Sequence, residues 1–175
     1  RDGLLDSCVM ILHDWSNFLS LEDNEIDKER GVIHEEWRTR NGAMNRMYEK
    51  ILPEIYGNDL YGNRLPIGLM DVIDNFKYQE LRDYYHKWYR PDLQGIIIVG
   101  DIDVDKMENR LKSIFADVQT PVDPAKRVYF PVTDNKEPIV SIVSDVEATN
   151  INLFLFNKHE AFPEEAKASA EYLAL

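Results

Sequence analysis

The spacing of apolar residues predicts helices in the first two thirds of the chain. From Leu4 to Leu21, apolar residues recur mostly every three or four positions, which is typical of a helix with one buried face. The same spacing predicts further helices, over 23–40, 44–56, 71–76, 77–88 and 104–115. Acidic residues at 22–27 favour a helix start near Asp23, because carboxylates interact well with the positive end of a helix.

Three other segments have the pattern of strands. Leu93 to Val99 is an almost continuous apolar run that ends at Gly100-Asp101, which indicates a buried strand. Apolar residues at 139–144 and 151–156 predict two more strands, and a final helix is expected from 166 to 175. Between these groups, residues 119–136 include Pro121, Pro124 and Pro131 and few periodic apolar positions, so we expect a linker there.

Composition narrows the classes of function. The net charge of −12 argues against nucleic-acid binding, because there is no basic surplus to neutralise phosphates. No apolar run is long enough to predict a membrane-spanning segment. Cys8 is the single cysteine, so an intramolecular disulfide is excluded, and its apolar neighbours predict a core position.

Glu29 and Glu36 form the candidate site with the clearest chemistry. They lie seven residues apart, almost two helical turns, so both carboxylates leave the same side of the predicted helix. Like charges on one face repel unless a cation, an arginine or a proton lies between them. A metal site would explain the pair, and a solvated acidic helix would explain it too. Spacing alone leaves both readings open.

Four ordered segments resemble a known family. They are Leu21–Arg40, the Tyr61-Gly62 to Pro66-Ile67-Gly68 loop, Tyr84–Asp92, and the strand that ends in Val99-Gly100-Asp101. The series is similar to the pitrilysin/insulinase family of zinc metallopeptidases, the inverzincins, which include the mitochondrial processing peptidases. The resemblance is good over residues 4–118 and loose beyond them.

The resemblance implies an α+β fold, with helices packed on a mixed or mostly antiparallel sheet in an incomplete metallopeptidase repeat. Residues 1–118 would be the later part of the catalytic repeat, 119–136 a proline-bearing linker, and 137–175 the beginning of the next repeat. An open sheet edge would favour pairing with another chain, so a homodimer is one expected arrangement.

The resemblance also implies a zinc site. In this family a His-x-x-Glu-His helix supplies two zinc ligands and the general base, and a distant glutamate is the third ligand. A supporting glutamate precedes that ligand by seven residues. On this pattern Glu36 is the third Zn²⁺ ligand and Glu29 is the supporting residue. His34 and Glu35 should point elsewhere, because successive helical residues diverge by about 100°.

The short zinc motif is missing from this sequence. The sequence has four histidines, and none of them begins a His-x-x-Glu-His or His-Glu-x-x-His sequence. They are His13, His34, His86 and His159. The family places that helix upstream of Arg1, so we expect the segment alone to be inactive and its Zn²⁺ site absent or incomplete.

The implied function is that of a zinc-dependent endopeptidase, which hydrolyses peptides or unfolded polypeptides through a zinc-activated water. A second half of the same protein, or a homologous subunit, would complete it. Two alternatives stay open: a non-catalytic subunit of the same fold that binds peptide or a partner, and an unrelated acidic interaction domain with surface glutamates.

Overall fold

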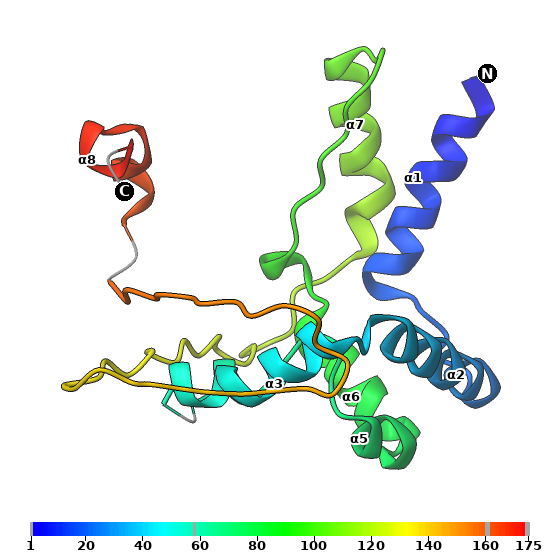
Figure 1. Cartoon of the computed structure of the whole chain (residues 1–175). Helices are drawn as coiled ribbons and strands as arrows, with labels where there is room; N and C mark the ends of the chain where they lie inside the picture. Colours follow the sequence, from blue (N-terminus) through cyan, green and yellow to red (C-terminus); the bar gives the residue numbers. More distant parts are fainter. Residues whose placement is uncertain (1, 58, 160–161, 174–175) are drawn as a thin grey trace. The chain divides into compact units, whose positions relative to one another are not determined.

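The computed structural model describes residues 2–57, 59–159 and 162–173 (Figure 1). The helices expected before residue 118 are present, which confirms those predictions. They are α1 (Asp2–Asn17), α2 (Asp23–Arg40), α3 (Ala43–Ile55), α5 (Met70–Asn75), α6 (Tyr78–Trp88) and α7 (Val104–Ile114).

Several shorter elements were not expected or differ from expectation. A short helix, α4 (Leu60–Asn63), lies where a loop was predicted. Single turns of 3₁₀ helix occur at η1 (Pro91–Leu93) and η2 (Phe115–Asp117). The helix expected from 166 to 175 is divided into η3 (Glu164–Ala168) and α8 (Ala170–Leu173), and its last two residues lie outside the described part of the chain.

The predicted sheet is wrong for this structure. The described residues form helices, turns and extended segments, and no strand occurs among them. Residues expected in strands are largely solvent-exposed: Ile97, from the strand predicted to be buried, is 87% exposed, and Ile142 and Ile151 are 91% and 101% exposed. Apolar and β-branched residues favour an extended backbone, but a strand also needs a neighbouring backbone about 4.8 Å away. The sequence pattern indicated a local preference for extended backbone but could not indicate a neighbouring strand. The α+β prediction is therefore wrong.

The chain divides into two compact units that alternate along the sequence. Unit 1 consists of Arg1–Arg40 and Pro66–Phe130, and unit 2 of Asn41–Leu65 and Pro131–Leu175. The buried apolar side chains of the described residues all belong to unit 1: Val9, Ile26, Tyr85 and Met107. The Tyr85 hydroxyl donates to the Trp15 carbonyl at 2.9 Å, so the one polar atom of this buried ring is paired.

Within unit 1, α1 packs along α7, and α2 packs against α5 (Figure 1). Val9 of α1 is only 1% exposed and marks the inward face of that helix. Cys8 is exposed, so its predicted core position is wrong. The two residues are neighbours in sequence and point about 100° apart, which explains how a helix in an apolar stretch buries one and exposes the other.

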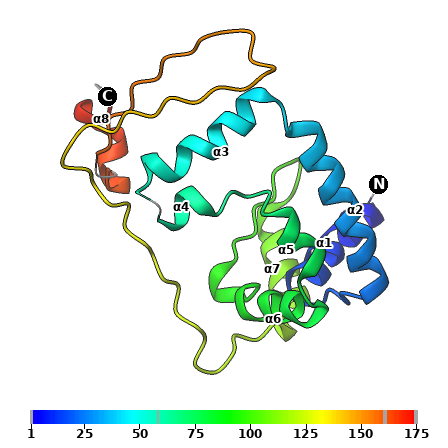
Figure 2. The same cartoon turned by 60° about the horizontal axis from the view of Figure 1, so that its bottom comes forward.

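Within unit 2, α3 and α4 lie side by side (Figure 2). The guanidinium of Arg46 on α3 donates to both carboxylate oxygens of Asp145, at 2.8 and 2.6 Å, and to Glu147 at 2.6 Å. These charge-assisted bonds attach the turn at 145–148 to α3. Among the described residues, none of the helices is both long and apolar enough to cross a lipid bilayer.

Candidate functional site

Helix α2 carries the candidate site, and its sequence explains its two ends. Asp23 and Glu25 lie in the first turn, and Arg38 and Arg40 lie in the last. This distribution complements the helix dipole, with negative charge at the amino end and positive charge at the carboxyl end. Ile26 is buried, and it fixes which side of α2 faces the rest of unit 1.

Glu29 and Glu36 lie on one flank of that buried side. At about 100° per residue, the two side chains differ in direction by only about 20°, and they lie about 70° from the line through Ile26, Ile33 and Trp37. Glu29 is exposed, and the Glu36 side chain is 38% exposed. The shared helical side predicted for the pair is therefore consistent with α2 as it stands in the structure.

The two carboxylates have different surroundings. A Glu36 oxygen pairs with the Arg40 guanidinium, one turn further on, at 3.0 Å. Within the described residues, Glu29 has neither a hydrogen bond nor an ion pair. An exposed pair of the Glu36–Arg40 kind typically contributes about 0.2–1 kcal/mol. Arg40 is thus a weak competitor for a metal ion.

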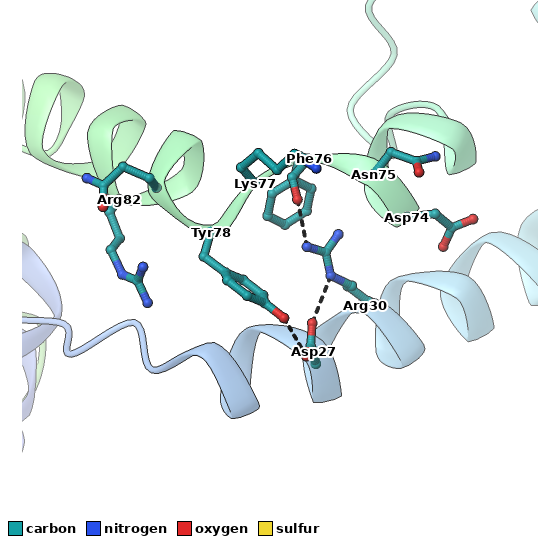
Figure 3. A pocket seen from close by; sticks show the side chains of 9 residues that line it. Asp27, Arg30, Asp74, Asn75, Phe76, Lys77, Tyr78 and Arg82 are labelled. Carbon is teal, nitrogen blue, oxygen red and sulfur yellow. Dashed lines mark hydrogen bonds and ion pairs between the residues drawn. The ribbon is translucent and has the colours of Figure 1, made fainter.

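The opposite flank of α2 carries a stripe of polar residues, Asp27, Arg30 and His34. They point within about 60° of one another, and all three contact residues 73–78, which comprise the end of α5, the connection to α6 and its first residue. This junction lines an open pocket of about 550 Å³, to which Asp27, Arg30, Phe76, Tyr78 and Arg82 contribute (Figure 3).

The polar groups of this pocket mostly bind one another. The Tyr78 hydroxyl donates to Asp27 at 2.8 Å, and this hydrogen bond to a carboxylate raises the pKa of Tyr78. Arg30 also pairs with Asp27, at 3.2 Å. His34 Nε2 lies 2.6 Å from a carboxylate oxygen of Asp74, and its side chain is 42% exposed. Most of these polar groups are therefore occupied in holding α2 against α5 and α6.

Only part of a zinc site can come from the described residues. A carboxylate oxygen is a suitable zinc ligand, and Glu36 fits as a single ligand on the accessible flank of α2. Three protein ligands are usual for a catalytic zinc. Across residues 2–57, 59–159 and 162–173, no three metal-binding side chains lie close enough together to hold an ion. Any zinc held by Glu36 therefore needs ligands from outside this set.

Comparison with known proteins shows which class of protein this chain resembles. The chain is 40% identical over 108 residues to a probable zinc protease, PqqL, of Haemophilus influenzae, an alignment that covers 62% of this chain and 12% of the relative. The crystal structure of the first half of the periplasmic protease PqqL from Escherichia coli matches with a TM-score of 0.67 and 33% identity, over 76% of this chain and 28% of that one. This chain therefore spans a small part of its relatives' length.

A third match is a mutant of the ferredoxin protease FusC, solved in complex with Arabidopsis ferredoxin. It has a TM-score of 0.67 and 28% identity, over 73% of this chain and 14% of that one. These relatives are proteases, and the PqqL relative is named as a zinc enzyme.

A family model described as the peptidase M16 inactive domain matches residues 75–171. The chain belongs to the peptidase M16 family, that of the pitrilysin-type zinc metalloproteases. The resemblance stated from the sequence is thereby confirmed. The match begins after α2, so Glu29 and Glu36 lie outside the matched residues.

Sequence reasoning missed the stripe of Asp27, Arg30 and His34. Its partners lie 40 to 51 residues away in sequence, where no helical periodicity can indicate them. One signal was available: Arg30 stands four residues after Ile26 and three before Ile33, on the apolar side of α2. A charged residue at such a position usually has a specific partner.

Proposed function

We propose that this chain supplies the third zinc ligand, Glu36, to the active site of an M16 zinc endopeptidase, with Glu29 as the supporting carboxylate. The observation that carries the proposal is the shared, accessible flank of α2, where Glu36 has only a weak partner and Glu29 has none among the described residues. The relatives' names support the zinc protease class.

The two glutamates would contribute in different ways. Glu36 would hold the ion through a carboxylate oxygen after release from Arg40. Glu29, about two helical turns away on the same flank, would support the zinc site as an outer group rather than as a ligand. Zinc, when bound, polarises the scissile carbonyl and lowers the pKa of a bound water. The remaining ligands and the general base would come from residues outside this chain.

Peptides or unfolded polypeptides are the proposed substrates, and another half of the same protein or a homologous subunit is the proposed partner. The relative solved as a first half supports a two-half arrangement. The relative solved with ferredoxin supports a polypeptide substrate. In this proposal the segment alone has no peptidase activity.

A second candidate function is a non-catalytic subunit that binds peptide or a catalytic partner. The observation that favours it is the matched model, which describes the inactive domain of the family. The two candidates differ in one respect that can be measured: only the first requires Glu36 for metal binding.

The test is Glu36→Gln in the full-length protein. We expect zinc affinity and peptidase activity to fall by more than the roughly 10–100-fold typical for loss of an outer supporting group. Glu29→Gln should produce a loss within that range. Zinc content by atomic absorption and hydrolysis of a fluorogenic peptide measure the two effects.

Glu35→Gln is the matched control, because Glu35 is the adjacent glutamate on α2 and pairs with Arg38 at the surface. It should leave zinc content and activity unchanged. Equal zinc content and activity in the Glu36→Gln and Glu35→Gln variants would exclude Glu36 as a ligand. A wild-type protein that itself binds no zinc and hydrolyses no peptide would instead favour the non-catalytic function.

A further inference from the structure

Arg30 connects α2 to the end of α5 and the segment that follows it, within unit 1. Its guanidinium donates to the Ile73 carbonyl, to the Phe76 carbonyl at 2.9 Å and to Asp27 at 3.2 Å. Its Cζ atom also lies 3.8 Å from the centre of the Phe76 ring (Figure 3). The side chain is only 16% exposed, although it carries a permanent charge.

The two carbonyls that Arg30 binds would otherwise lack their helical partners. The N–H of Lys77, four residues after Ile73, donates instead to the Glu80 carboxylate at 2.6 Å. The N–H of Glu80, four residues after Phe76, donates to the Lys77 carbonyl at 2.9 Å. Arg30 therefore completes the corner where α5 ends and α6 begins, as basic side chains often do at helix C-termini.

A second contact fixes the same rotation of α2. His34, one turn after Arg30, pairs with Asp74 of α5 at 2.6 Å. Because Arg30 and His34 are four residues apart, they hold the same side of the helix at two successive levels. A helix held at two levels on one side cannot turn about its axis without breaking both contacts.

The start of α2 is also attached to α6. Arg82 donates to the Leu21 carbonyl at 3.2 and 2.8 Å and pairs with Asp23. Leu21 has a φ of +47°, which a leucine rarely adopts. Contacts from α5 and α6 therefore hold α2 at its amino-terminal end and near its middle.

Rotation of α2 matters because Glu36 lies near the helix surface, about 5–6 Å from the axis. A turn of only about 10° would move its carboxylate by about 1 Å. Protein ligands to a metal keep their distances within about 0.2 Å. We propose that Arg30, through its bonds to the Ile73 and Phe76 carbonyls, sets the rotation of α2 and so positions Glu36 toward the metal; this inference rests on the function proposed above.

The experiment compares Arg30→Gln and Arg30→Lys in the full-length protein. Glutamine cannot bridge both carbonyls and loses the charge, and lysine keeps the charge without the planar fork of donors. We expect zinc affinity, measured by chelator competition, to fall by about 10-fold or more in Arg30→Gln, within the range known for groups that orient metal ligands. Arg30→Lys should recover part of that loss.

Two further measurements separate positioning from general stability. The visible spectrum of the Co²⁺-substituted protein should change in Arg30→Gln, because it reports the coordination of the ion. In addition, kcat should fall more than KM changes, since substrate binding does not require Arg30. Both are measured at a temperature where circular dichroism shows the variant folded, and Arg30→Lys decides the question if Arg30→Gln does not fold.

Arg38→Gln is the matched control, because Arg38 is on the same helix, is 70% exposed and pairs only with Glu35 among the described residues. If the Arg30 variants bind zinc as tightly as Arg38→Gln while Glu36→Gln does not, the positioning inference is overturned and the proposed function survives. If Glu36→Gln itself retains full zinc affinity, the proposed function fails, and the inference fails with it.

Discussion

In unit 1, the direction in which a helix points a side chain decides which partners that side chain can reach. On α2, Glu29 and Glu36 leave one flank, and Arg30 and His34 leave the other. On α1, His13 points toward η2, where its Nε2 lies 2.9 Å from Asp117 and its Nδ1 lies 3.0 Å from Asp14. Both ring nitrogens can donate only when the imidazole is protonated.

This arrangement predicts that the stability of unit 1 depends on pH through His13. The hydrogen bond to Asp117, and to a lesser extent that to Asp14, raises the pKa of His13 above its ordinary 6.5. The stabilisation is therefore complete below about pH 6.5 and is lost as pH rises through the raised value. Urea unfolding on both sides of this window should show the decrease, and His13→Gln should abolish it.

The exposed His86 is the control residue, since it has no carboxylate partner among the described residues. His86→Gln should retain the wild-type pH dependence. If His13→Gln retains it as well, the source lies elsewhere.

At the scale of elements, α3 and α4 pack at a corner that depends on one glycine. A Cβ atom on Gly62 would lie 2.8 Å from the Pro53 Cα and 2.9 Å from the Leu52 carbonyl oxygen. Both obstacles are backbone atoms, which cannot move aside as a flexible side chain would. Gly62 is accordingly buried at the contact between the two helices.

Gly62→Ala should destabilise unit 2 by about 1–3 kcal/mol, the usual result of overfilling a packed contact. Gly31→Ala is the contrasting change, because nothing lies within 4 Å of the added Cβ in the middle of α2. It should stabilise the protein by about 0.5–1 kcal/mol. Thermal unfolding measures both, and a neutral Gly62→Ala would show that α4 does not pack on α3 in this way.

The sequence predicted the helices well, and the start of α2 was predicted because acidic residues mark it. The contact between α2 and the α5–α6 corner could not be predicted, since it joins residues more than 40 positions apart. The incorrect prediction of a β-sheet has a different cause. Segments such as 139–144 and 151–156 have strand-like composition, but their exposed residues show no pairing within the described chain.

At the scale of the whole molecule, we retain as a proposal the division into 1–118, a linker at 119–136, and 137–175. Most described residues of 119–136 are exposed and lie in no helix. Exposed, irregular segments are the preferred sites of proteolytic cleavage. Limited proteolysis should therefore cut within 119–136 before it cuts within any helix of residues 1–118. A first cut within α6 or α7 would contradict the proposed linker.

The central proposal is that Glu36 binds zinc in the complete protein. Anomalous diffraction at the zinc edge from crystals of the full-length protein tests it most directly. We predict an anomalous peak about 2.0–2.2 Å from a carboxylate oxygen of Glu36, with Arg40 released. A fully occupied zinc whose ligands do not include Glu36, with the Glu36–Arg40 pair intact, would contradict the claim.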